Sequence, residues 1–220
     1  SMSSPDPVKM SAMEDAIAKE AGVKGELKSQ NEIKEEVEDI IVDLDLQNVA
    51  NVIKQNALYW NVVSMDETVI DQVNILKAVM RGMHQCLRNA IDFIKKHDPT
   101  VSFSDICALI DGNYFQPYCH IDNESNALVP IEYYTFEKGD GRYIGIASAG
   151  ILAKTSRDAY VLEECAKYPL LVERYKLDTN YGYGTKHHLE GLKTYGMSPW
   201  HRKTYGSCKH AKSNSEDFYF

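Results

Sequence analysis

A run of five apolar residues, Ile106 to Ile110, limits the possible folds of this chain more than any other segment. The run stops at Asp111-Gly112-Asn113, a combination that is typical of a turn. A strand without polar residues is buried on both faces, and such strands lie in sheets that are covered by helices. The run therefore predicts an α/β protein.

Apolar residues at helical spacing predict the covering helices. A stripe from Val69 to Ile94 follows Asp66-Glu67 and is closed by Lys95-Lys96-His97, so we expect one long helix there. Further helices are predicted over residues 31–57, with a break near Asp43, over 144–167 and over 187–195. Short strands are predicted over residues 59–64 and within 128–136.

The order of these segments predicts one α/β domain with two appendages. Residues 1–30 combine Ser, Pro, Met and charge without a sustained apolar stripe, which favours a flexible amino-terminal arm. Residues 31–205 hold the predicted helices and strands, and residues 206–220 form a carboxyl-terminal tail. No internal repeat is present.

Composition restricts the compartment and the partners. No run approaches the roughly 18 apolar residues of a membrane span, and five cysteines cannot all pair, so we expect a cytoplasmic or nuclear protein with no membrane partner. The net charge of -8 argues against a general nucleic-acid coat. Residues 138–220, however, hold 13 Lys and Arg against 9 Asp and Glu, so this part is suited to phosphate contact. Solvated helix faces are the alternative interpretation.

Two aspartates stand at comparable places in the pattern. Asp111 closes the apolar strand, and Asp140 lies between two glycines just after the next strand. If the two strands are neighbours, both carboxylates meet at one edge of the sheet and could hold Mg²⁺ or Mn²⁺. Asp-Gly pairs are also ordinary turn residues, so a turn without a metal remains the alternative.

Two further segments carry charge or aromatic residues in a pattern that suits nucleic acid. Lys154 and Asp158 share a helix face beside Arg157, which is either an ordinary ion pair or part of a phosphate site. Residues 180–188 interleave Tyr, Gly, Lys186 and His, as a loop that meets a sugar or base would, although a plain glycine-rich loop has the same composition. Arg202 follows in a basic segment after Pro199-Trp200.

In their order, these pieces resemble ribonuclease HII, the type 2 ribonuclease H family. The strings that carry the resemblance span about the carboxyl-terminal two-thirds of the chain. They are Ala57–Ser64, Ile70-Asp71 with Asn74–Ala78, Ile110–Asn113, Lys138–Asp140, Ile146–Lys154 with Arg157-Asp158, Gly182–Thr185 with His188-Leu189, and Ser198–Arg202.

The resemblance implies a ribonuclease H-like mixed sheet flanked by helices, with a carboxyl-terminal helical extension. It implies an endonuclease that hydrolyses the RNA strand of RNA/DNA hybrids and cuts at ribonucleotides embedded in duplex DNA, by a two-metal mechanism with Mg²⁺ or Mn²⁺. Asp111 and Asp140 match metal-binding acids of the family, and Asp158 matches an acid that supports the site. Tyr183 matches the tyrosine that packs on the sugar at the RNA-to-DNA junction, and Lys154, Arg157, Lys186 and Arg202 are the expected substrate contacts.

The sequence departs from the family at its first strand. The motif Asp-Glu-(Ala or Val)-Gly-Arg-Gly, which supplies two metal-binding acids, is not found, and Asp66-Glu67 opens a helix instead. Glu38, Asp43, Asp45 or another subunit are candidate replacements, and the incomplete sheet allows either a monomer or self-association. Two functions therefore compete: an active nuclease, and an inactive module of the same fold that binds hybrids or other partners.

Overall fold

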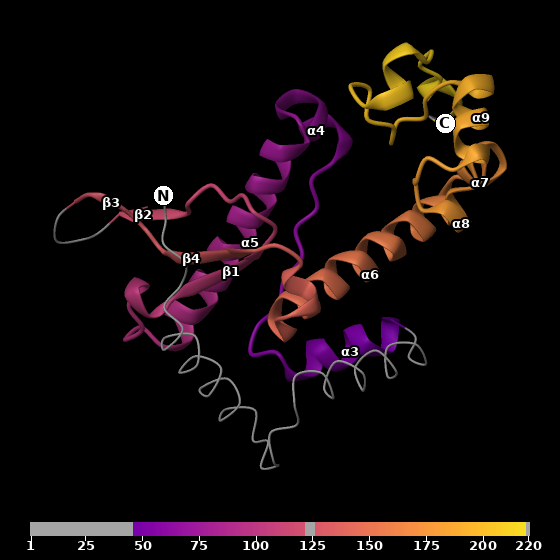
Figure 1. Cartoon of the computed structure of the whole chain (residues 1–220). Coiled ribbons are helices and arrows are strands. Elements are labelled where there is room, and N and C mark those ends of the chain that lie inside the picture. The colour runs from indigo at the N-terminus through magenta and orange to yellow at the C-terminus, as the bar shows by residue number, and fades with distance from the viewer. Residues whose placement is uncertain (1–45, 122–125, 219–220) are drawn as a thin grey trace. The chain divides into compact units, whose positions relative to one another are not determined.

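The computed structural model describes residues 46–121 and 126–218 of the 220-residue chain (Figure 1). The chain divides into two compact units, residues 1–48 and 49–220. The predicted arm at residues 1–30, the predicted domain boundary at residue 31 and the predicted break near Asp43 lie outside the described residues. The helices are α3 (Leu46–Asn56), α4 (Glu67–Val73), α5 (Ile75–His97), α6 (Ile144–Lys167), α7 (Leu170–Tyr175), α8 (Leu177–Asn180) and α9 (Lys186–Tyr195). The strands are β1 (Cys107–Asp111), β2 (Cys119–Ile121), β3 (Leu128–Pro130) and β4 (Glu132–Phe136).

Strands β1 and β4 lie side by side as a parallel pair, which Figure 1 shows next to α5. Ala108 and Ile110 of β1 are buried with Met80 of α5, and Phe115 and Ile131 complete this core. Cys107 and Leu109, which alternate with them, are only partly buried. Both predicted strands are therefore confirmed, and their carboxyl ends lie at the same edge.

The strand predicted over residues 59–64 is wrong. In the described part of the chain this segment is extended but pairs with no strand. It lies along α5 through side chains instead: the Tyr59 ring stacks on Phe93 with centroids 4.5 Å apart, and Asn61 donates to the Cys86 carbonyl oxygen at 3.3 Å. Aromatic and β-branched residues pack against a helix as well as within a sheet, so the local pattern could not distinguish a strand from a segment that lies along a helix.

The single long helix predicted after Asp66 is in fact two helices, α4 and α5. Asn74 separates them with a φ of 70°, and its side chain accepts a hydrogen bond from the Lys77 backbone N–H at 3.1 Å. Asn tolerates the left-handed region better than most residues and is a good helix cap. The apolar stripe continues through Asn74, so the hydrophobic periodicity does not indicate where α4 ends and α5 begins.

The helical carboxyl-terminal part has a core of its own. Helix α6 has the predicted bounds, and its Cys165 packs with Leu171 and Tyr175 of α7 and with Leu177. Phe218, inside the predicted tail at residues 206–220, is 3% exposed and joins this core. The boundary at residue 205 stays a prediction, but the described residues beyond it are packed against the helices.

The remaining features complete the expected class. β2 and β3 form an antiparallel pair, so the described strands include both parallel and antiparallel pairing. All five cysteines are free. Among the helices that the structure describes, none is long and apolar enough to cross a membrane. The α/β class with a helical carboxyl-terminal part is confirmed.

Candidate active site

The parallel pairing of β1 and β4 brings Asp111 and Asp140 to one edge of the sheet. Asp111 is in register with Phe136, and the Gly112 N–H donates to the Phe136 carbonyl oxygen at 2.8 Å. The chain then turns through Lys138, and the Gly139 N–H donates to Oδ1 of Asp111 at 2.9 Å. Asp140 is the next residue, in the short turn Gly139–Gly141. The backbone next to Asp140 therefore contacts the Asp111 carboxylate, while the meeting of both carboxylates at one cation stays a prediction.

Gly139 lies in crowded surroundings. A Cβ atom there would lie 2.8 Å from Ile146 Cδ1 and 3.1 Å from Phe136 Cβ, whereas its 3.4 Å from Asp111 Oδ1 would be ordinary contact. Glycine thus lets the turn pack on Ile146 and Phe136. The Gly139 N–H then holds the orientation of the Asp111 carboxylate.

The two carboxylates fit a divalent cation in kind. Both side chains are exposed at the edge, and Asp140 Oδ1 accepts from the Gly141 N–H at 3.0 Å. Carboxylate oxygens are the ligands that Mg²⁺ and Mn²⁺ prefer. Within residues 46–121 and 126–218, however, no group of three or more His, Cys, Asp or Glu side chains is placed to hold a metal. The described residues thus supply part of a metal site.

Asp158 belongs to a different cluster, on α6. Its carboxylate accepts from Lys154 Nζ at 2.8 Å and from Arg157 Nη1 at 2.7 Å. Partial burial works against the charged form, but these two hydrogen bonds and charges prevail and lower the pKa of Asp158 below its ordinary value. Asp158 therefore stays ionised and orients Arg157; a supporting role toward the metal site stays a prediction.

Arg157 connects this cluster to Tyr183. Its guanidinium carbon lies 4.8 Å from the centroid of the Tyr183 ring, and its Nη2 donates to the Tyr181 carbonyl oxygen. The Tyr183 side chain is nevertheless 64% exposed. The ring is thus supported by a cation while much of its surface is open to a ligand.

A buried histidine pair lies behind the same loop. The sequence suggested His188 for contact with a sugar or base and His201, beside Arg202, for contact with phosphate, but both side chains are buried. His188 Nδ1 is 2.9 Å from the Tyr183 carbonyl oxygen, and His188 Nε2 is 2.9 Å from His201 Nε2. Ser198 contacts His201 Nδ1 through its hydroxyl at 2.7 Å and through its N–H at 3.1 Å. Burial, together with the neighbouring His188, lowers the pKa of His201 to about 4. Their spacing, Thr185-x-x-His188 and Ser198-x-x-His201, was the only signal available in the sequence.

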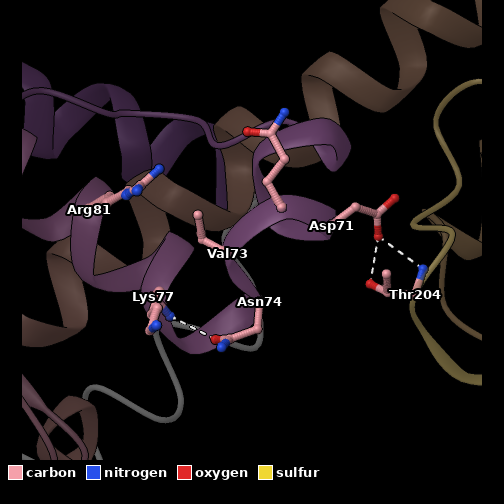
Figure 2. Close-up of a pocket in the computed structure, with 7 residues that line it drawn as sticks. Asp71, Val73, Asn74, Lys77, Arg81 and Thr204 are labelled. Atoms are coloured by element: carbon pink, nitrogen blue, oxygen red, sulfur yellow. Dashed lines mark hydrogen bonds between the residues drawn. The ribbon is translucent and has the colours of Figure 1, made fainter.

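The other predicted substrate contacts lie apart from these clusters. Lys186, at the start of α9, is 85% exposed, and its Nζ is 3.9 Å from Glu190. The Arg202 guanidinium stacks on Tyr205 at 4.1 Å. The backbone after Arg202 is held by Asp71, whose carboxylate accepts from the Lys203 N–H at 2.8 Å. It also accepts from the N–H and the hydroxyl of Thr204 at 2.9 and 2.6 Å (Figure 2). Figure 2 also shows the open pocket beside this tether, lined by Lys77 and Arg81 among others.

Comparison with known proteins agrees with the resemblance. The family model for ribonuclease HII matches residues 9–208. The ribonuclease HII of Parabacteroides distasonis is 40% identical over 154 residues, which cover 70% of this chain and 65% of that protein. The ribonuclease HII of Cytophaga hutchinsonii is 35% identical over 151 residues, covering 69% and 63%. The chain spans a little under two-thirds of the length of these relatives.

The family match also fits the architecture. A parallel strand pair and a helical carboxyl-terminal part are consistent with a ribonuclease H-like α/β fold. The chain belongs to the ribonuclease HII family.

Proposed function

We propose that the chain acts as a type 2 ribonuclease H, an endonuclease that hydrolyses the RNA strand of RNA/DNA hybrids and cuts at ribonucleotides embedded in duplex DNA. The observation that carries the proposal is that Asp111 ends β1 at the edge where the turn bearing Asp140 follows β4, with the Gly139 N–H bonded to the Asp111 carboxylate. Two acids at one edge could hold the cations that hydrolysis of a phosphodiester uses.

In this proposal Asp111 and Asp140 hold Mg²⁺ or Mn²⁺. The bound cations supply a more acidic water and stabilise negative charge on the phosphate oxygens. The Gly139 N–H restricts rotation of the Asp111 carboxylate, so the free oxygen keeps its direction toward the edge. The candidate further acids Glu38, Asp43 and Asp45 lie outside the described residues.

The helical part would bind the substrate. Tyr183 offers an exposed ring that suits packing on a sugar, and Arg157 supports the ring from behind. Lys154, Lys186 and Arg202 are cations suited to phosphate oxygens, which position a duplex without reading its sequence. The cytoplasmic location, like the choice between Mg²⁺ and Mn²⁺, stays a prediction.

Cleavage of an RNA/DNA hybrid tests the proposal. In the presence of Mg²⁺ or Mn²⁺ the full chain should cut the RNA strand, and Asp111→Asn should lower the rate at least about 100-fold because a ligand charge is lost. Asp92→Asn makes the same chemical change on the exposed surface of α5 and should leave the rate unchanged. Equal rates for the wild type and Asp111→Asn would refute the assigned site.

A second candidate is an inactive module that binds hybrids, and one observation favours it. The described residues contain no group of three or more candidate ligands, so metal binding by residues 46–121 and 126–218 alone would be weak. This candidate predicts hybrid binding that persists in EDTA and weakens steeply with salt, together with no cleavage. Cleavage that requires Asp111 would exclude it.

A further inference from the structure

Four residues form a series of hydrogen bonds that begins at Tyr183 and runs through His188 and His201 to Ser198. The groups at the two ends of this series each have a fixed hydrogen-bonding role. The Tyr183 carbonyl oxygen can only accept, so His188 Nδ1 must carry a hydrogen. The Ser198 backbone N–H can only donate, so His201 Nδ1 must be bare.

The two ends together determine the proton on each ring. A neutral His201 with a bare Nδ1 carries its hydrogen on Nε2, and this hydrogen points at His188 Nε2, 2.9 Å away. His188 Nε2 must therefore accept, so His188 is also neutral with its hydrogen on Nδ1. Every donor in the series then meets an acceptor, and the direction of donation runs from Ser198 to Tyr183.

The surroundings leave the two rings little freedom. His188 and His201 are 9% and 8% exposed. Tyr175, which is fully buried, packs against both rings with centroids 6.0 and 4.9 Å apart, and its hydroxyl donates to the Gly196 carbonyl oxygen at 2.9 Å. A buried ring that lost its hydrogen-bond partner could not bond to water instead, so the series of hydrogen bonds is held in one arrangement.

The loop is also held by Asn180, whose side chain accepts from the Gly182 N–H at 2.9 Å and whose carbonyl oxygen accepts from the Tyr183 N–H at 2.8 Å. Tyr181 and Gly182 both have positive φ values, 49° and 81°. The Tyr183 carbonyl oxygen also accepts from the Thr185 N–H at 2.8 Å, a contact local to the loop. His188 is the contact that ties this carbonyl to the buried helical part, while Arg157 supports the ring.

We infer that His188, through the hydrogen bond from its Nδ1 to the Tyr183 carbonyl oxygen, is a positioning residue that fixes the direction of the Tyr183 ring for contact with the sugar of a ribonucleotide-containing strand. This inference rests on the proposed function, because it gives Tyr183 a substrate to contact. His188 acts through the Tyr183 carbonyl and not through the substrate, and its effect therefore requires the tyrosine ring.

Two substitutions at His188 separate its two hydrogen bonds. The amide nitrogen of Asn takes the place of Nδ1, so His188→Asn keeps a donor for Tyr183 and loses the contact with His201. The amide group of Gln reaches the place of Nε2, so His188→Gln keeps an acceptor for His201 and loses the donor to Tyr183. Each variant loses one buried hydrogen bond, which makes their stabilities comparable, and thermal unfolding of both checks this.

The readout is the affinity for a duplex that carries one ribonucleotide, measured in EDTA so that cleavage plays no part, relative to an all-DNA duplex. Tyr183→Ala should reduce this preference about tenfold, the size of one lost aromatic contact. His188→Gln should reduce it about fivefold, and His188→Asn should stay within about twofold of the wild type. In the Tyr183→Ala background, His188→Gln should have no further effect on the preference.

Each other result counts against the inference in a recognisable way. If Tyr183→Ala reduces the preference but His188→Gln does not, the positioning role is wrong and the tyrosine contact stands. If His188→Gln still reduces the preference without the tyrosine, or if His188→Asn is equally impaired, the histidine pair is merely structural. If Tyr183→Ala itself has no effect, the substrate contact assigned to Tyr183 in the proposed function fails, and the inference fails with it.

Discussion

At the scale of single residues, the candidate site depends on contacts that the sequence pattern contains only in part. Asp111 and Asp140 could be paired in advance, because acids at the ends of neighbouring parallel strands share an edge. The contacts that support Tyr183 could not be predicted from the sequence. Arg157 and His188 reach this residue from separate helices, and sequence spacing does not show which ring faces which carbonyl. The spacing of Asp158 is compatible with an ion pair or with a site acid; the structure shows its ion pairs with Lys154 and Arg157, and its supporting role at the site stays a prediction.

The buried histidine pair predicts how stability depends on pH. The pKa of His201 is about 4 in the folded chain against 6.5 ordinarily, so the unfolded chain binds the extra proton between these values. The stabilisation is complete above pH 6.5 and is lost as the pH falls toward 4. For one such group, the unfolding free energy should fall by about 2 kcal/mol between neutral pH and pH 5.

Urea unfolding of the wild type and His201→Gln at pH 7.5, 6 and 5 measures this contribution. The variant lacks the titrating ring, so the difference in unfolding free energy between the two proteins should shrink by about 2 kcal/mol as the pH falls to 5. A difference that stays constant over this range would show that His201 keeps an ordinary pKa.

At the scale of elements, α7 and α9 approach each other at a position where only glycine fits. A Cβ atom on Gly191 would lie 1.9 Å from the Arg174 carbonyl oxygen and 3.1 Å from Tyr175 Cδ1. The histidine pair belongs to the same packing. His188 is on α9, His201 follows α9, and Tyr175 of α7 packs on both rings. The spacing of these helices therefore also sets the site behind Tyr183.

A matched pair of glycine substitutions tests this packing. Gly191→Ala must push α7 and α9 apart and should cost about 3 kcal/mol of unfolding free energy or more. Gly150→Ala, on the exposed face of α6 with open space around the new Cβ, should stabilise the chain by up to about 1 kcal/mol. Thermal or urea unfolding measures both. Equal effects of the two substitutions would contradict the close approach of α7 and α9.

The predictability of the elements follows from how local their signals are. The helix at residues 144–167 and the strands β1 and β4 have strong internal patterns, and the sequence predicts them well. Residues 59–64 have the composition of a strand, but their partner is a helix surface, and only the tertiary structure decides that. Helices α7 and α8 are too short for periodicity to detect, at 6 and 4 residues.

At the scale of the whole molecule, the positive charge and the candidate substrate contacts lie in the same part of the sequence, as the proposed function needs. The segment from residue 138 onward carries the excess of Lys and Arg, and it also contains Tyr183 and its supports. The Asp71 tether to Lys203 and Thr204 connects α4 to the end of this basic segment. In the proposed function, substrate binding belongs to the helical part, and hydrolysis to the sheet edge that carries Asp111 and Asp140.

Cleavage of a duplex DNA that carries a single ribonucleotide, in Mg²⁺ or Mn²⁺, tests this account most directly. The wild-type chain should cut this duplex at the ribonucleotide and leave the matched all-DNA duplex intact, because the 2′-hydroxyl distinguishes the two substrates. Asp140→Asn should abolish the cut while binding of the duplex in EDTA is retained. Binding without any cleavage by the wild type, or cleavage that persists in Asp140→Asn, would contradict the assignment of Asp111 and Asp140 as the catalytic edge of this chain.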